Sequence, residues 1–251
     1  MENNQIIYGI HPVEELLRQR LSSVDHVFFE KGRKSSQLFN LMKFCRKERL
    51  SYNLVPEMKL RQLTAITHHQ GVAAISSVIP YLTIEQLREI LDRKPDPIIV
   101  LPASIEDPGN LGAIIRSAVA FGADALLLER KHTTPLSPAV AKSSAGAMEH
   151  CAIARPKNLE ALLAELIAEG FRVIGTDVKR GKIPPAVALT GPLILVLGGE
   201  HRGIPPYLLK SCGELISIPM SNETHSLNVA ATAAILLYEI TRQRTGAAPL
   251  P

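Results

Sequence analysis

Short runs of hydrophobic residues alternate with amphipathic stretches through the C-terminal part of the chain. The runs are rich in Val, Ile and Leu and predict strands at 98–101, 125–128, 173–176, 193–197 and 215–218. Apolar spacing typical of helices predicts four of them, at 111–121, 138–149, 159–169 and 227–240. Continuous apolar strands that alternate with helices predict a parallel sheet covered on both faces, in which ligands bind at the carboxyl ends of the strands.

The N-terminal part has a different pattern and predicts a second, smaller domain. Helices are expected at 13–21 and 36–48, and short strands at 25–30, 52–55 and 72–78. A short amphipathic helix with apolar Leu87 and Leu91, followed by Pro95 and Pro97, is typical of a linker. The sequence therefore predicts an α/β chain with a small domain at 1–80, a linker at 81–96 and a parallel-sheet domain at 97–251.

Composition restricts the class of protein without identifying it. The chain has 251 residues, 46% of them hydrophobic and 21% charged, as in ordinary globular proteins. No apolar run approaches the roughly 20 residues of a membrane span, and the N-terminus lacks a signal segment, so a cytoplasmic protein is expected. Cys45, Cys151 and Cys212 are odd in number and widely spaced, which predicts buried thiols and neither disulfides nor a zinc site.

Positive charge is concentrated in the N-terminal part. The whole net charge of +4 lies within residues 1–95, and residues 31–61 contain nine Lys or Arg against Glu48 and Glu57. Such a segment attracts a phosphate backbone, whereas the alternative is a solvated helix face. The candidate RNA-binding residues are Lys31, Arg33, Lys34, Lys43, Arg46 and Lys47.

Three loops that come after predicted strands carry the candidate chemistry. Residues 104–112, SIEDPGNLG, lead into a helix, with Asn110 as a plausible N-cap and Arg116 further along. Because the neighbours of Arg116 are apolar, we expect this arginine to be partly buried and to need an anionic partner; otherwise it is a surface residue.

The loop after the fourth strand is rich in glycine. Its sequence at 197–205, LGGEHRGIP, lets a ligand approach the backbone, but its spacing matches neither the dinucleotide nor the Walker pattern, so NAD and ATP are unsupported. His201 has no second ligand at metal spacing, and no metal is assigned.

The loop after the fifth strand, IPMSNETHSLNV at 218–229, opens the last long helix. Ser226 is a candidate cap of that helix. Asn228 in the first turn, together with free N–H groups, favours a polar ligand.

Taken together, the segments DPGNLGAIIRSA, LVLGGEHRGI and IPMSNETHSLNVAATAAILLYE closely resemble the three motifs of the SpoU (TrmH-like) branch of the SPOUT RNA methyltransferases. IYGIHPVEELL and HHQGVAA resemble the extra RNA-binding domain of the RlmB-type bacterial 23S rRNA guanosine 2'-O-methyltransferases. The resemblance implies a C-terminal SPOUT domain with a deep trefoil knot, S-adenosyl-L-methionine bound in the knot, a homodimer and a function in rRNA processing. Knots are too rare for any sequence pattern to predict.

The resemblance also implies which residues form the active site. It assigns catalytic roles to Asn110, Arg116, Glu200, Ser226 and Asn228, and cofactor binding to Gly198, Gly203, Ile218, Met220 and Leu227. We expect Arg116, oriented by Glu200 and Asn110, to bind an RNA phosphate or stabilise the developing alkoxide, with Ser226 and Asn228 near the ribose. Direct deprotonation by Arg116 is the alternative, which the high pKa of guanidinium disfavours.

Three functions are compatible with these residues. The motifs favour a methyltransferase that modifies a ribose 2'-hydroxyl of 23S rRNA, with a guanosine as the expected target. A relative that acts on tRNA or adenosine is the second, and a noncatalytic RNA-binding homologue is the third. The last helix presents apolar residues on several sides, which predicts a homodimer unless the helix is buried within one chain.

Overall fold

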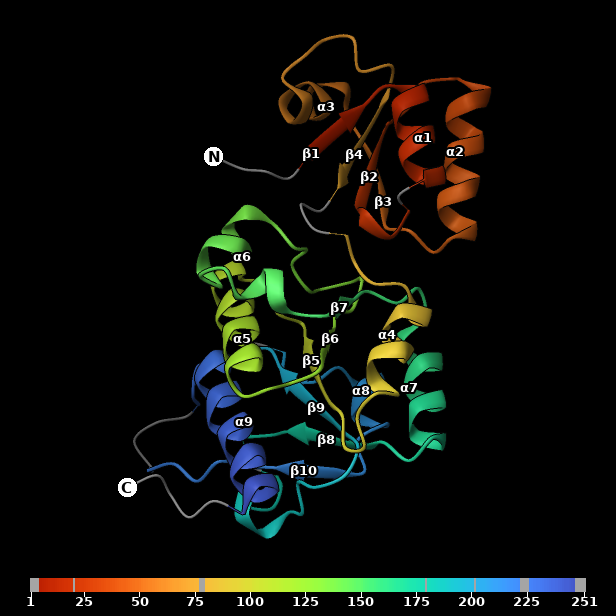
Figure 1. Ribbon diagram of the computed structural model, residues 1–251. Coiled ribbons are helices and arrows are strands. Elements are labelled where there is room, and N and C mark those ends of the chain that lie inside the picture. Colours follow the sequence, from red (N-terminus) through yellow and green to blue (C-terminus); the bar gives the residue numbers. More distant parts are fainter. Residues whose placement is uncertain are drawn as a thin grey trace. The chain divides into compact units, whose positions relative to one another are not determined.

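The computed structural model describes residues 5–19, 21–76, 80–178, 180–200, 202–221 and 226–246 (Figure 1). The chain divides into two compact units: Met1–Tyr81 with Pro135–Pro138, and Leu82–Thr134 with Ala139–Pro251. None of the helices in the described ranges is long and apolar enough to span a membrane.

The first unit contains a four-stranded mixed sheet in the order β1-β4-β2-β3, in which β2 and β3 are parallel and the other pairs antiparallel. Three of its strands and two helices were predicted from the sequence, whereas β1 and α3 were not; positions 77–79 lie outside the described residues. The elements are β1 (Gln5–Tyr8), α1 (Ile10–Gln19), β2 (Val24–Glu30), α2 (Ser36–Lys47), β3 (Tyr52–Val55), α3 (Glu57–Thr64) and β4 (Val72–Ser76), with a 3-10 turn at Leu21–Ser23.

The core of the first unit lies between the sheet and helices α1 and α2. Leu17 of α1 and Leu38 of α2 are buried against Val27 and Phe29 of β2. Ser35 caps α2, because its side chain accepts a hydrogen bond from the Leu38 N–H. The apolar face of α2 is thus turned inward, and its basic residues stay on the outer surface.

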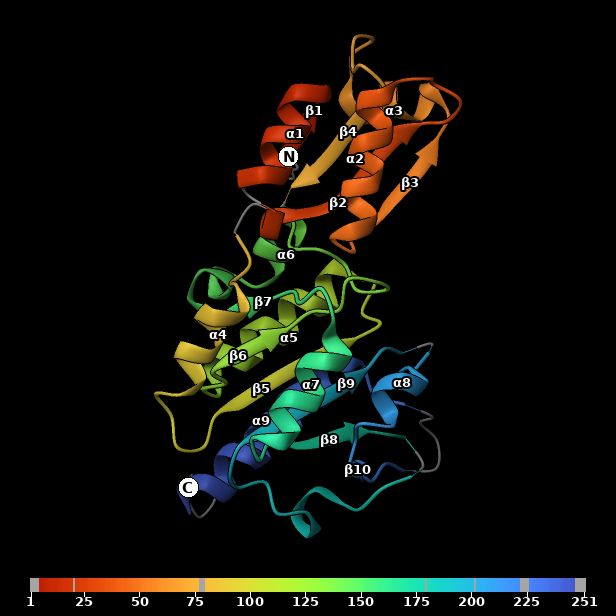
Figure 2. The ribbon, with the colours of Figure 1, turned by 90° about the vertical axis from the view of Figure 1, so that its right-hand side faces the viewer.

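The second unit is built on a six-stranded sheet in the order β10-β8-β9-β5-β6-β7 (Figure 2). Every strand pair in it is parallel, which confirms the predicted parallel sheet. Its elements are α4 (Ile84–Leu91), β5 (Ile98–Ala103), α5 (Pro108–Ala120), β6 (Ala125–Leu127), α6 (Pro138–Ser143), β7 (Ile153–Ala154), α7 (Leu159–Ala168), β8 (Arg172–Thr176), β9 (Leu193–Gly198), α8 (Pro206–Leu209), β10 (Glu214–Ile216) and α9 (Val229–Thr245), with 3-10 turns at Ala147–His150 and Pro184–Ala186.

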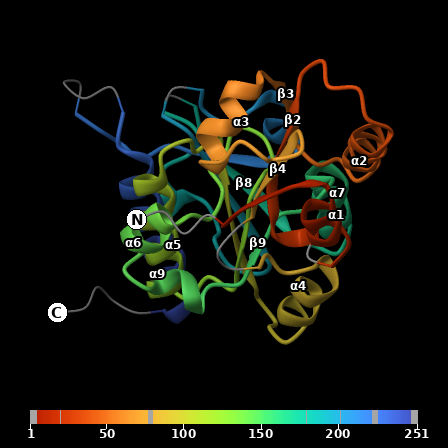
Figure 3. The ribbon, with the colours of Figure 1, turned by 90° about the horizontal axis from the view of Figure 1, so that it is seen from above.

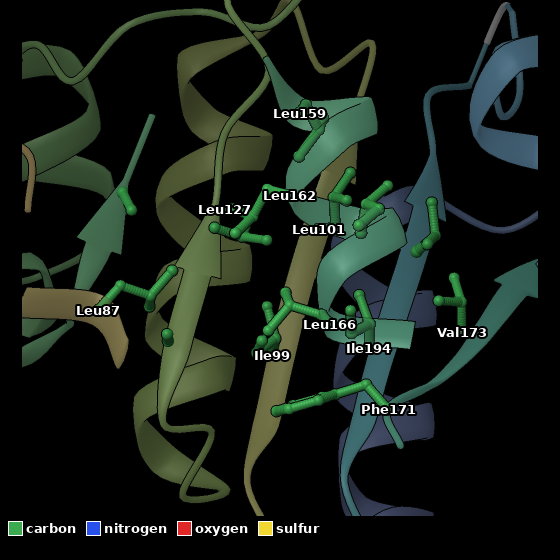
Figure 4. Packing of buried hydrophobic residues seen from close by; sticks show 14 of the residues in the cluster. Leu87, Ile99, Leu101, Leu127, Leu159, Leu162, Leu166, Phe171, Val173 and Ile194 are labelled. Atoms are coloured by element: carbon green, nitrogen blue, oxygen red, sulfur yellow. The ribbon is translucent and has the colours of Figure 1, made fainter. Parts of the chain in front are cut away.

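Helices cover both faces of this sheet, with α4 and α7 on one face and α5 and α9 on the other (Figures 1 and 3). On the first face, leucines of α7 lie over Ile99 and Leu101 of β5 and Ile194 of β9 (Figure 4). Burying each such side chain contributes about 1.5–3 kcal/mol. Leu163 is fully buried there, so truncating it to Ala would cost about 2–5 kcal/mol.

The sequence suggests a linker at 81–96, but in the structure residues 82–96 are part of the second unit and Tyr81 belongs to the first. Leu87 and Leu91 of α4 are buried in its hydrophobic core, and Arg88 bridges Glu165 and Glu169 at the end of α7. Proline marks the end of this helix region correctly, but apolar periodicity cannot say which core the helix joins. The chain first passes from one unit to the other between residues 81 and 82.

The three cysteines are free. Cys45 is buried as predicted, whereas Cys151 and Cys212 are only half-buried. Burial raises the pKa of the Cys45 and Cys151 thiols to about 12 and that of Cys212 to about 11. All three therefore stay protonated at neutral pH and are poor nucleophiles.

Candidate active site

The loop after β5 leads into α5, and its start differs from the sequence prediction. Asp107, not Asn110, is the N-cap: its side chain accepts a hydrogen bond from the Asn110 N–H, and Pro108 occupies the first helical position. Asp followed by Pro is a strong helix-start signal, because the cap supplies an acceptor and proline needs none. The side chain of Asn110 is consequently free for other contacts.

The start of α9 also differs from the sequence prediction. Asn228, not Ser226, is the N-cap, and its Oδ1 accepts hydrogen bonds from the N–H groups of Ala230 and Ala231. Capping fixes the rotamer of Asn228 and leaves its side-chain amide nitrogen as a donor.

That amide joins the three motif loops. Asn228 Nδ2 donates to Asn110 Oδ1 over 2.8 Å and to Glu200 Oε1 over 2.7 Å, and Asn110 Nδ2 lies 3.4 Å from the same Glu200 oxygen. The second carboxylate oxygen of Glu200 accepts no hydrogen bond from the described residues. Residues far apart in sequence thus form one polar cluster, and its second Glu200 carboxylate oxygen is available to accept a hydrogen bond.

Arg116 does not join this cluster, and the expectation that it is partly buried is wrong. It is exposed, and it makes no hydrogen bond or ion pair with any described residue. Six residues on an α-helix turn through about 600°, so Arg116 points about 120° away from Asn110. The apolar neighbours Ile114 and Ile115 form the buried face of α5, and Arg116 lies outside it.

A pocket of about 460 Å³ lies at the carboxyl ends of β8, β9 and β10. All five residues expected to bind the cofactor line it, together with Glu200 and Ser226. Its walls are mainly apolar, and Asp177 and Arg180 add charge at the end of β8. The five expected residues are Gly198, Gly203, Ile218, Met220 and Leu227.

The glycine loop that borders this pocket folds back on itself. The Gly203 N–H donates to the Gly199 carbonyl oxygen over 2.8 Å, and Gly203 has a φ of 61°. A Cβ on Gly198 would lie 2.6 Å from the Gly203 carbonyl carbon, and one on Gly199 would lie 2.2 Å from the Ser104 carbonyl oxygen. Only glycine fits at these two positions, because backbone atoms cannot move aside.

A second cavity of about 340 Å³ shares part of its wall with the first. Glu200, Arg202 and Val229 line both cavities, and Asn110 and Asp107 line the second. The polar cluster therefore lies where the two cavities meet.

Sequence reasoning missed a buried carboxylate beneath these loops. Glu129, only 3% exposed, accepts hydrogen bonds from the Ser104 N–H over 2.6 Å, the Thr133 hydroxyl over 3.1 Å and the Tyr207 hydroxyl over 2.5 Å. Burial, and then the hydrogen bond to Glu129, raise the pKa of Tyr207. Glu129 thus ties the base of the β5 loop to α8, the helix after the glycine loop. The sequence signal that could have indicated this residue is its position, because Glu129 is an acidic residue directly after the apolar run at 125–128.

The candidate RNA-binding residues are all exposed on the first unit. Arg33 forms an ion pair with Glu30 over 2.9 Å, Arg46 lies 3.4 Å from the Tyr52 hydroxyl, and the Lys43 ammonium lies 4.9 Å from the centre of the Phe39 ring. Lys31, Arg33 and Lys34 come after β2, whereas Lys43, Arg46 and Lys47 lie on α2.

Within the described part of the chain, no three or more His, Cys, Asp or Glu side chains are grouped so that they could hold a metal ion.

Family models match both units. Residues 97–238 match the SpoU rRNA Methylase family, and residues 6–81 match the family described as RNA 2'-O ribose methyltransferase substrate binding. The protein belongs to the SpoU rRNA methylase family. The resemblance inferred from the motifs is thereby confirmed.

Relatives match over nearly the whole chain. The 23S rRNA (guanosine-2'-O-)-methyltransferase RlmB of Nitrosomonas europaea is 35% identical, covering 98% of this chain and 95% of the relative. A putative TrmH family tRNA/rRNA methyltransferase of Staphylococcus haemolyticus is 30% identical, covering 95% and 96%.

Solved structures have the same architecture. The AdoMet-bound rRNA methyltransferase from Sinorhizobium meliloti has a TM-score of 0.58 at 25% identity, covering 95% of this chain and 87% of that one. The SpoU methyltransferase AviRb from Streptomyces viridochromogenes, in complex with AdoMet, shares the fold with a TM-score of 0.60 at 24% identity, covering 98% and 92%. The expected fold class, a SPOUT domain with a small N-terminal α/β domain, is confirmed.

Proposed function

We propose that the protein transfers the methyl group of S-adenosylmethionine to the ribose 2'-hydroxyl of a guanosine in 23S rRNA. The observation that carries this proposal is the Asn110–Glu200–Asn228 cluster at the junction of two cavities. A methyl transfer needs the donor on one side of such a junction and the acceptor hydroxyl on the other. The RlmB relatives support 23S rRNA and guanosine as the substrate.

The larger pocket fits the cofactor. Ile204, Ile218 and Leu227 provide apolar surface for a purine, and Gly198, Gly199 and Gly203 let the cofactor come close to the backbone of the loop. Its volume of about 460 Å³ lies within the range of small-molecule sites. When bound, S-adenosylmethionine supplies a methyl group that is already activated by the sulfonium.

The residues of the chain then have to orient the ribose. Asn228, held by its cap hydrogen bonds, fixes one oxygen of Glu200, and the other oxygen can accept a hydrogen bond from the 2'-hydroxyl. Ser226 lines the larger pocket and binds near the ribose. Arg116, exposed and unpaired among the described residues, binds an RNA phosphate. Alignment of the hydroxyl with the methyl group is the main contribution.

The test is methyl transfer by the full chain to unmodified 23S rRNA and, in parallel, to tRNA. Nuclease digestion and mass spectrometry should detect 2'-O-methylguanosine in 23S rRNA, and Asn110→Ala or Arg116→Ala should abolish it with cofactor affinity retained. Lys210→Ala, an exposed residue outside both cavities, is the control. Methylation of tRNA alone would show that the protein is a tRNA methyltransferase, the alternative function. No methylation of either RNA would contradict the proposal.

The first unit selects the RNA in this proposal. Its exposed basic residues support that role, as does the substrate-binding family match. Changing Lys43, Arg46 and Lys47 to Gln should weaken RNA binding and reduce the slope of log affinity against log salt by about 2, if each residue contacts one phosphate. Filter binding over a salt series measures the slope, and an unchanged slope would leave RNA selection to the second unit.

Three further features belong to the same proposal. The match to the SpoU rRNA Methylase family supports a trefoil knot around the cofactor pocket. A homodimer is proposed from Ile235 and Tyr238 of α9, which are 41% and 42% exposed, although the other apolar residues of that helix are mostly buried within one chain. Light scattering at micromolar protein tests the dimer. A ribosomal RNA substrate makes the cytoplasm the expected compartment.

A further inference from the structure

Arg202 is a charged residue near the polar cluster that the proposed methyl transfer does not use. It lies in the glycine loop two residues after Glu200, is exposed and lines both cavities. Its Nη1 lies 3.3 Å from His132 Nδ1, in the loop after β6. It forms no ion pair with any described carboxylate. An arginine without an acidic partner at the edge of a site is available for an external anion.

His132 holds the guanidinium in place. An arginine N–H only donates, so His132 Nδ1 is the acceptor in this contact. His132 has a φ of 62°, in the left-handed region that glycine favours and that Asn, Asp and His adopt more often than other residues. The next residue toward the N-terminus, Lys131, is also exposed and basic.

The interior of the second cavity has the opposite character. Glu106, Asp107 and Glu200 line it, and Arg202 is its one cationic lining residue among those described. Carboxylates accept hydrogen bonds from hydroxyl and N–H groups but repel phosphate. The cavity is thus suited to the uncharged part of a nucleotide, and a phosphate attached to it would have to lie at the rim beside Arg202.

We propose that Arg202, oriented by His132, binds the RNA backbone phosphate next to the target ribose. This inference rests on the proposed function, which puts the ribose at the junction beside Glu200. The phosphodiester on the 3' side is attached to the carbon next to the one that carries the 2'-hydroxyl, so it has to lie close to that junction. The planar guanidinium matches two phosphate oxygens at once, and a lysine ammonium does not.

A second anion could satisfy the same arginine. Arg202 also lines the larger pocket, and S-adenosylmethionine has a carboxylate. The two sources are separated by measuring cofactor affinity and RNA affinity independently, because each source predicts a loss in only one of them.

The experiment compares full-length Arg202→Ala and Arg202→Lys with Arg93→Ala, which removes an exposed arginine of the same unit outside both cavities. RNA binding to a 23S rRNA fragment is measured by filter binding over a salt series, and S-adenosylhomocysteine binding by calorimetry. Arg202→Ala should weaken RNA binding by about 10-fold or more and reduce the salt slope by about 0.7, with unchanged calorimetry. Arg202→Lys should recover part of the loss.

A loss of S-adenosylhomocysteine affinity with normal RNA binding would overturn the proposal in favour of the carboxylate. Effects no larger than those of Arg93→Ala would overturn it altogether. These are binding measurements, so they stay informative if the wild-type chain transfers no methyl group, a result that would refute only the proposed function.

His132 is tested with two variants that both tolerate its backbone conformation. His132→Gly removes the acceptor without strain, and His132→Asn keeps an acceptor oxygen near the Nδ1 position. The Gly variant should show part of the RNA-binding defect of Arg202→Ala, and the Asn variant should bind more tightly than the Gly variant. Equal, wild-type binding by both would show that His132 does not orient Arg202.

Discussion

Removing the buried carboxylate of Glu129 should weaken the second unit and the site above it. In Glu129→Leu the side-chain volume is similar, but three donors lose their acceptor. Ser104 is only 8% exposed, so its N–H would be left without a ready partner, whereas the Thr133 hydroxyl still has the Pro102 carbonyl oxygen within 3.4 Å. Tyr207 is half-buried, so water can reach its hydroxyl.

The magnitude depends on these differences. An orphaned buried donor costs about 1–3 kcal/mol, and each replaceable hydrogen bond about 0.5–1.5 kcal/mol. The variant no longer has the desolvation cost of burying a carboxylate, and this gain offsets part of the loss. We therefore expect Glu129→Leu to lower the free energy of unfolding by about 2–4 kcal/mol. Glu129→Gln can still accept from Ser104 and donate to the Tyr207 oxygen, so about 1 kcal/mol is expected.

Tyr207→Phe is the matched variant, because it removes only the third hydrogen bond and should cost least. The chain has no Trp, so urea unfolding is monitored by far-ultraviolet circular dichroism. The two units can unfold separately, and the comparison applies to the transition that the second unit gives. A Glu129→Leu protein within about 0.5 kcal/mol of the wild type would refute the reasoning. Methyl transfer should fall in the same order as stability.

Two other changes test the site loop and the sheet edge. Gly199→Ala would put a Cβ 2.2 Å from a backbone oxygen, so it should cost about 1–3 kcal/mol or more and abolish cofactor binding in calorimetry, whereas Gly213→Ala, with its nearest atom at 3.9 Å, should do neither. The hydrogen bond from Lys182, and then that from Arg172, lower the pKa of Glu214. A lowered folded-state pKa gives stability that is complete above the unfolded-state pKa and disappears as the pH falls through the folded-state value. Glu214→Gln should therefore be less stable than the wild type at neutral pH but not in strong acid, and thermal melts showing a pH-independent difference would contradict this.

Hydrophobic patterning predicted the strands of the second unit well, because each is a continuous apolar run in a sheet covered on both sides. The strand order β10-β8-β9-β5-β6-β7 could not be read in the same way. The apolar runs have the same hydrophobic pattern, so periodicity cannot distinguish them. Which strands pair depends on how each crossover helix packs. β7 has only two residues and β1 only four, which is too short for a recognisable period.

In the site, the sequence predicted the positions of residues better than the directions of their side chains. Asn110, Glu200 and Asn228 each come after a strand of a parallel sheet, so the rule that such loops share one edge correctly predicts that they approach one another. The family resemblance placed Arg116 with them, but Arg116 is six residues along a helix from Asn110, and this spacing changes the direction of a side chain by about 120°. The proposed contact of Arg116 with an RNA phosphate therefore needs RNA that extends beyond the loop that carries Asn110, and RNA bound across α5 would satisfy that condition.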